Sequence, residues 1–163
     1  MPVKYILFVL VLFFLITCDH GIAPDNESSS ITGISGSVYF RNWPPADSIK
    51  LLKMVVFYNF PPKDILSEVL NDSAFAYPTA LTESLPYGID SLHYEMELKA
   101  GRYGYIVIAQ QYGDDIFNDW RAVGQHDKTP ADSLPTAVFV EKGILKTNID
   151  IIVDFNQLPV QPF

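Results

Sequence analysis

The segment Leu92–Leu98 carries the clearest secondary-structure pattern in the chain. Apolar and polar residues alternate along it, with Leu92, Tyr94, Met96 and Leu98 on one side and His93, Glu95 and Glu97 on the other. Successive side chains of a β-strand point to opposite faces of its sheet. The segment therefore predicts a strand with one face in a core and one face in water.

Other β-prone segments end at Pro or Gly residues, which interrupt strands. They are Ile31–Phe40, Leu51–Phe60, Tyr103–Ala109, Ala137–Val140 and Leu145–Phe155. The last two are expected to form a hairpin around Lys142-Gly143. The final strand is expected to place Ile149, Ile151, Val153 and Phe155 on one face, opposite Asp150 and Asp154.

The remaining segments carry little β-pattern. Lys63–Leu70 has apolar residues at helical spacing and predicts a two-turn helix. Asn71–Tyr87 is expected to be rich in loops, and Gln111–Pro135 to be the longest irregular stretch. Strands at regular intervals, joined by turns that contain Pro and Gly, predict an all-β protein built as an antiparallel β-sandwich.

The charge of the chain limits its partners. The 163 residues contain 19 Asp and Glu against 11 Lys and Arg, for a formal net charge of −8. An acidic chain repels phosphate backbones, so nucleic acid is not an expected partner. The sequence also shows no basic run of the kind that binds anionic lipid head groups.

The N-terminus follows the pattern of a signal peptide. Lys4 precedes the apolar run Tyr5–Ile16, which is shorter than the roughly 20 residues of a membrane-spanning helix. Leu15-Ile16-Thr17-Cys18 resembles the lipobox of bacterial lipoproteins. That resemblance implies that residues 1–17 are removed and that Cys18 receives acyl chains such as palmitate. An uncleaved N-terminal anchor is the alternative.

A lipid on Cys18 would place the protein in the bacterial cell envelope, bound to a membrane. Asp19–Ser30 is expected to be a flexible tether with a reach of about 17–21 Å. Asp19 resembles an inner-membrane retention signal of enterobacteria, and the choice between inner and outer membrane stays open. Residues 31–157 are predicted to form the sandwich domain and residues 158–163 a C-terminal tail. Cys18 is the only cysteine, so no disulfide is expected and stability must come from the core.

The order of the strands resembles the carboxypeptidase regulatory-like, or transthyretin-like, β-sandwich of bacterial surface lipoproteins. The matching segments are Ser35–Phe40, Met54–Phe57, Tyr94–Ile108, Val138–Gly143 and Ile149–Asp154. The most specific is Tyr94–Ile108, in which a strand, a turn of small residues and a Tyr that opens the next strand follow one another. The resemblance implies a fold and a surface setting, and it assigns no reaction.

The sequence shows no recognisable catalytic constellation. It lacks Gly-x-Ser-x-Gly, and lipid would consume the single thiol. Histidines outside the tether are His93 and His126, which stand apart from each other. We therefore predict that the protein is not an enzyme and needs no cofactor. An enzyme would require His126, Asp127 or Asp119 to converge in a pocket.

One passage combines acids, an amide and an aromatic ring, and it is the candidate binding loop. Its residues are Asp114, Asp115, Asn118, Asp119 and Trp120. Hard cations prefer several oxygen ligands, so Asp114, Asp115 and Asp119 are a weak Ca²⁺ candidate, although the passage does not match an EF-hand. The alternative is a solvated acidic loop with no metal.

Two tryptophans leave the class of ligand open. Trp43 and Trp120 could stack on sugar rings, or each could close one end of the sandwich as a buried plug. The sequence thus predicts a lipid-anchored, non-catalytic module that acts by binding or assembly, with a protein or glycan partner. A cell-surface carbohydrate-binding module is the first alternative, and an enzyme or enzyme subunit is the second.

Overall fold

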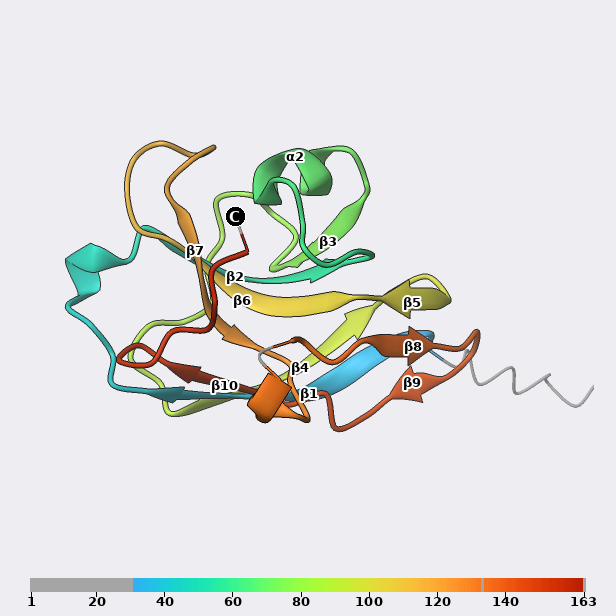
Figure 1. Cartoon of the computed structure of the whole chain (residues 1–163). Coiled ribbons are helices and arrows are strands. Elements are labelled where there is room, and N and C mark those ends of the chain that lie inside the picture. Colours follow the sequence, from blue (N-terminus) through green and yellow to red (C-terminus); the bar gives the residue numbers. More distant parts are fainter. Residues whose placement is uncertain (1–30, 133, 163) are drawn as a thin grey trace, which may run out of the picture.

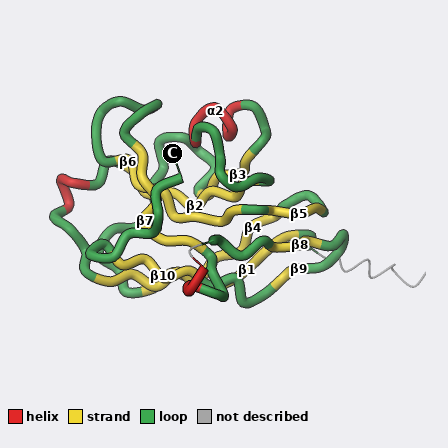
Figure 2. The backbone as a smooth tube through the Cα atoms, viewed as in Figure 1, coloured by secondary structure: helices red, strands yellow, loops and turns green. Residues whose placement is uncertain are grey.

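The computed structural model describes residues 31–132 and 134–162, which are built almost entirely from β-strands and loops (Figures 1 and 2). The strands are β1 (Gly33–Arg41), β2 (Leu51–Phe57), β3 (Ala74–Tyr77), β4 (Ser91–Glu97), β5 (Gly101–Tyr103), β6 (Tyr105–Gln111), β7 (Trp120–Gln125), β8 (Val138–Val140), β9 (Leu145–Lys146) and β10 (Ile151–Asp154). Within the described residues, helix is confined to α2 (Ile65–Leu70) and 3₁₀ turns at Ala46–Ser48 and Pro130–Asp132. The predicted all-β class and the predicted short helix are confirmed.

Eight strands form one sheet in the order β3-β2-β6-β7-β10-β1-β4, with β9 paired beside β10 on the same edge of β1. The expectation of wholly antiparallel pairing is wrong, because β1 runs parallel to both β9 and β10. Gly33 is the partner of Leu145, and Val38 is the partner of Ile151. The end of the chain therefore follows the first described strand in the same direction, and the sheet is mixed.

The predicted hairpin around Lys142-Gly143 does not form. β8 pairs with β5, where Arg102 is the partner of Phe139, while β9 pairs with β1. The expected strand Tyr103–Ala109 is also divided, because the chain bends at Gly104 and its two parts join different sheets. A Cβ atom on Gly104 would lie 2.9 Å from Tyr58 O, so the bend depends on glycine.

Two strands lie in segments that were expected to be irregular. β3 lies within Asn71–Tyr87, and β7 lies within Gln111–Pro135. β7 sits in the middle of the sheet between β6 and β10. Its sequence carries Arg121, Gly124 and Gln125, which hide the strand pattern. Gly124 is needed there, because a Cβ atom would approach Ile152 O to 2.7 Å.

The sheet curls around one main core. β2 and β6 lie on one side of it, and β1, β4 and β10 lie on the other, with β7 between the two halves (Figure 1). The buried side chains of this core include Ile34, Leu52, Met54, Tyr94, Ile106, Ile108, Ile149 and Ile151. The predicted inward faces of β4 and of the last strand are confirmed, since Met96 and Val153 are buried whereas Glu95 and Asp150 are exposed.

A second, smaller core lies on the outer face of β2 and β6, under α2. It contains Val55, Phe57, Ile65, Ala74, Tyr105, Val107, Ala109 and Ala122. Asp64 caps the start of the helix, since its carboxylate accepts a hydrogen bond from Ser67 N at 2.7 Å. Such a cap satisfies one of the free amides of the first helical turn. Ile65 then packs its side chain into the second core.

Two buried tyrosine hydroxyls differ in their partners. Tyr94 donates to Ile149 O, whereas the Tyr105 hydroxyl has no partner among the described residues. Burial raises the pKa of both phenols. A buried polar group without a hydrogen-bond partner destabilises the fold by its desolvation free energy, whereas a hydrogen bond offsets that penalty for a paired group.

The matched substitutions Tyr105→Phe and Tyr94→Phe test this difference. Tyr105→Phe is expected to leave the free energy of unfolding unchanged or to raise it by about 1 kcal/mol, because it removes an unpaired hydroxyl. Tyr94→Phe is expected to lower that free energy by about 1–2 kcal/mol, because Ile149 O loses its donor. Urea unfolding measures both. Equal effects of the two substitutions would contradict the assigned pairing.

Candidate functional site

The predicted binding loop lies between β6 and β7, and its acidic side chains bond within the loop itself. Asp115 accepts hydrogen bonds from Phe117 N at 2.9 Å and from the side-chain amide of Asn118 at 2.8 Å. The Asp119 carboxylate accepts from Asp115 N at 2.9 Å. The hydrogen bonds that the Asp115 carboxylate accepts, led by that of the Asn118 side chain, hold the pKa of Asp115 below its usual range. The carboxylates thus stabilise the turn.

The three carboxylates of the Ca²⁺ candidate do not converge. Asp115 and Asp119 are linked through the turn, whereas Asp114 forms an exposed ion pair with Lys50 at 3.0 Å. Among residues 31–132 and 134–162, no group of three or more His, Cys, Asp and Glu side chains is placed to hold a metal ion. The loop of this structure is a self-bonded acidic turn.

Neither tryptophan forms an open platform. Trp43 donates to Ile89 O at 2.9 Å, stacks on Phe40 and contacts Phe155 at a tilt, so it packs against the main core. Trp120 is half-buried against the second core and donates to Ile116 O at 2.7 Å. Both indole N–H groups are therefore bonded to backbone. The geometry of each ring fits a packing role.

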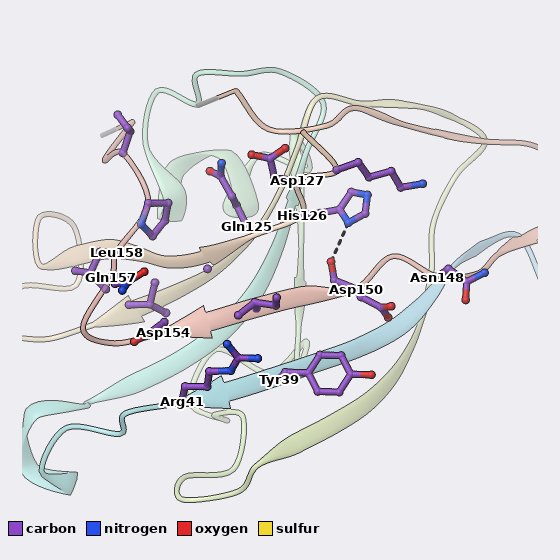
Figure 3. A pocket seen from close by; sticks show the side chains of 16 residues that line it. Tyr39, Arg41, Gln125, His126, Asp127, Asn148, Asp150, Asp154, Gln157 and Leu158 are labelled. Carbon is purple, nitrogen blue, oxygen red and sulfur yellow. Dashed lines mark hydrogen bonds between the residues drawn. The ribbon is translucent and has the colours of Figure 1, made fainter. Parts of the chain in front are cut away.

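A groove of about 750 Å³ lies elsewhere, on the outer face of β1, β10 and β7 (Figure 3). Residues 157–160 of the C-terminal tail form one side of it. The tail is held in place beyond the groove, because the Gln161 side chain accepts from Ala122 N at 2.8 Å and donates to Ala122 O at 3.1 Å. A side-chain amide thus takes the place of a neighbouring strand on β7.

The floor of the groove carries a row of side chains across three strands. Tyr39 on β1 is the partner of Ile152 on β10, and Ile152 is the partner of Gln125 on β7. Residues paired in this way point to the same face of a sheet. Tyr39 is 44% exposed and Ile152 is 55% exposed. An aromatic ring and an aliphatic side chain therefore lie together at an accessible surface.

Charged groups lie beside this row. Arg41 on β1 is the partner of Asp154 on β10. The Asp154 carboxylate accepts from the Asn42 side chain at 2.8 Å and from Asn156 N at 2.9 Å. The Asn42 bond is the main reason why the pKa of Asp154 is lowered. Asp154 is thus a fixed anion beside Arg41, and the groove offers both donors and acceptors.

His126 also lines the groove, but its ring is buried. The side chain is 2% exposed, and Nδ1 donates to Asp150 O at 2.9 Å. Nε2 is buried and has no partner within the described part of the chain. Asp127 lines the same groove, whereas Asp119 does not. Of the three residues named for a catalytic site, the sequence neighbours His126 and Asp127 line the groove, and the imidazole is covered from solvent.

Sequence reasoning did not identify the groove. Its signal was present in the last strand, where Ile152 stands between Asp150 and Asp154 on the face expected to be wet. Tyr39 is a similar apolar interruption on the outer face of β1. Exposed apolar residues that neighbour each other on adjacent strands are the feature that could have located it.

Comparisons with known proteins add no assignment: no protein-family model, no curated protein and no solved structure matches the chain. Within the described residues, no helix has the length and apolar character needed to cross a membrane. The signal-peptide and lipidation predictions concern residues 1–30, which lie outside the described residues.

The packing of Trp120 predicts a stability effect. Trp120→Ala is expected to lower the free energy of unfolding by about 2 kcal/mol, because it removes a large, half-buried ring that packs against the second core. Phe117→Ala is the matched control in the same loop, since Phe117 is 54% exposed. Its effect should stay within about 0.5 kcal/mol. Thermal unfolding of both variants measures the two effects. An unchanged melting temperature for Trp120→Ala would contradict the packing role.

Proposed function

We propose that this chain is a lipid-anchored, non-catalytic binding module of the bacterial cell envelope. Acyl chains on Cys18 would hold it to a membrane, and the groove on β1, β10 and β7 would bind its partner. The sequence from Lys4 to Cys18 supports the anchor.

The groove is the observation that carries the binding role. Its volume of about 750 Å³ falls within the range of small-molecule sites, about 300–1,000 Å³. Apolar contact from Tyr39 and Ile152 is combined there with polar groups from Arg41, Gln125 and Asp154. Such a mixture is typical of sites that gain affinity from apolar contact and orientation from a few polar groups.

Carbohydrate is the ligand class that this mixture favours. An aromatic face can pack on the C–H face of a sugar ring, while planar polar side chains exchange hydrogen bonds with its hydroxyls. Tyr39 supplies an exposed ring, and the side chains of Arg41, Gln125 and Asp154 line the same groove (Figure 3). A protein partner that inserts a polar loop into the groove is the competing occupant.

The fold family is part of the proposal. We propose a β-sandwich of the carboxypeptidase regulatory-like, or transthyretin-like, type. The curl of the sheet supports it, since the inner faces of β2 and β6 pack against those of β1, β4 and β10. The parallel pairing of β1 with β10 departs from the antiparallel sandwich that the sequence predicted.

Lipidation can be tested directly. In the membrane fraction of a bacterium that expresses the full chain, the N-terminal peptide is expected to begin at Cys18 and to carry acyl mass. Cys18→Ser should abolish both features, because serine offers no thiol for the transfer. Mass spectrometry measures both. A wild-type peptide that begins at Met1, or an unmodified Cys18, would contradict the anchor.

The groove can be tested with two tyrosines of equal exposure. Tyr39 and Tyr112 are each 44% exposed, one in the groove and the other in the acidic loop. On an array of bacterial cell-wall and capsular glycans, Tyr39→Ala is expected to reduce binding about five- to tenfold, because stacking contributes about 1–1.5 kcal/mol. Tyr112→Ala should leave binding unchanged. The reverse result would assign recognition to the β6–β7 loop, and no glycan binding would favour a protein partner.

A further inference from the structure

One end of the molecule gathers segments that are distant in sequence. It is formed by the β4–β5 turn, by β5 and β8, by β9, and by the start of β1 (Figure 1). Gly33 N donates to Ile144 O at 3.2 Å, and Gly143 N donates to Thr32 Oγ1 at 2.7 Å. The described chain therefore begins at this end, which we call the basal surface.

The basal surface is positively charged in an otherwise acidic protein. Lys99, Arg102, Lys142 and Lys146 lie there, and all four are exposed. Its carboxylates are Glu97 and Glu141. The rest of the described chain holds six Lys and Arg against fourteen Asp and Glu. The sequence shows no basic run, so this concentration of cations arises only from the fold.

Exposed apolar side chains accompany these cations. Phe139 on β8 is 60% exposed, and Ile144 in the β8–β9 turn is 47% exposed. Ile31, the first described residue, is 37% exposed. Phe139 is the direct partner of Arg102 across the β5–β8 pair. Apolar residues beside exposed cations are the combination that binds at the interface of an anionic bilayer.

We propose that the basal surface docks on an anionic phospholipid bilayer, with Phe139 and Ile144 at the interface and the four cations on the lipid phosphates. This docking rests on the proposed lipid anchor. Twelve residues separate Cys18 from Ile31, so Ile31 lies within about 47 Å of the anchor even with a fully extended tether.

Because the tether holds the domain near the bilayer, weak contacts are sufficient for the basal surface to dock. Attachment through a short linker gives an effective concentration in the millimolar range, so the surface needs little intrinsic affinity. Each Lys or Arg close to an anionic surface increases partitioning about fivefold. Reversal of two of the four cations should therefore release the basal surface while the acyl chains keep the protein on the membrane.

The experiment uses full-length lipidated protein in vesicles, with hydrogen exchange measured over residues 138–146. Exchange is expected to be at least fivefold slower in phosphatidylglycerol vesicles than in phosphatidylcholine vesicles, and salt at about 0.5 M should remove the difference. Arg102→Glu with Lys142→Glu should also remove it. Lys50→Glu with Lys63→Glu, the same charge change outside the basal surface, should preserve it.

Flotation separates the anchor from the docking. All three proteins are expected to float with the vesicles and to retain a cooperative thermal transition. Loss of flotation by the wild-type chain would overturn the anchor and the docking together. Flotation with equal exchange in both kinds of vesicle would overturn the docking alone. Equally slow exchange in neutral detergent micelles would assign the protection to contacts within the chain and would also overturn it.

Discussion

The pairing of β1 on both of its edges determines most of this structure. One edge carries β4, and the other carries β9 and then β10, so β1 joins the middle of the sequence to its end. Close approach depends on Gly36, where a Cβ atom would lie 2.3 Å from Ile149 O. Tyr94, the cross-strand partner of Gly36, donates its hydroxyl to that same carbonyl oxygen. The absence of a side chain at Gly36 lets the backbone of Ile149 approach, and the Tyr94 side chain then hydrogen-bonds to it.

Both proposed surfaces depend on this strand. The start of β1 pairs with β9 and belongs to the basal surface, whereas its other end supplies Tyr39 and Arg41 to the groove. Because β1 runs parallel to β10, Tyr39 lies beside Ile152 and Arg41 lies beside Asp154. An antiparallel hairpin at the end of the chain would have placed other side chains against Tyr39. The parallel pairing is therefore what assembles the groove.

Sequence patterns predicted the strands that alternate or are apolar throughout, and they missed β3 and β7. Leu92–Leu98 has one wet face, so its pattern survives in the sequence. β7 lies between two neighbouring strands, and its buried residues are Ala122, Val123 and Gly124. These three consecutive residues give no alternation of apolar and polar side chains. The groove was missed because it joins residues more than 100 positions apart, such as Tyr39 and Ile152. Lys53 is another residue whose burial the sequence does not reveal. Its side chain is buried, and its ammonium donates hydrogen bonds to Pro78 O and Ala80 O.

The length of β1 relates the two surfaces to each other. Gly33 lies at the basal end, and Tyr39 lies six residues further along the same strand. At about 3.3 Å per residue, the backbone of Tyr39 stands roughly 20 Å from that of Gly33 along the strand. A domain that rests on a bilayer through Phe139 and Ile144 would therefore hold the groove above the head groups, at a height where a cell-wall glycan or a protein loop can reach it. The acyl chains and the basal surface would together fix that orientation, because a lipid on a tether restricts distance but leaves the domain free to rotate.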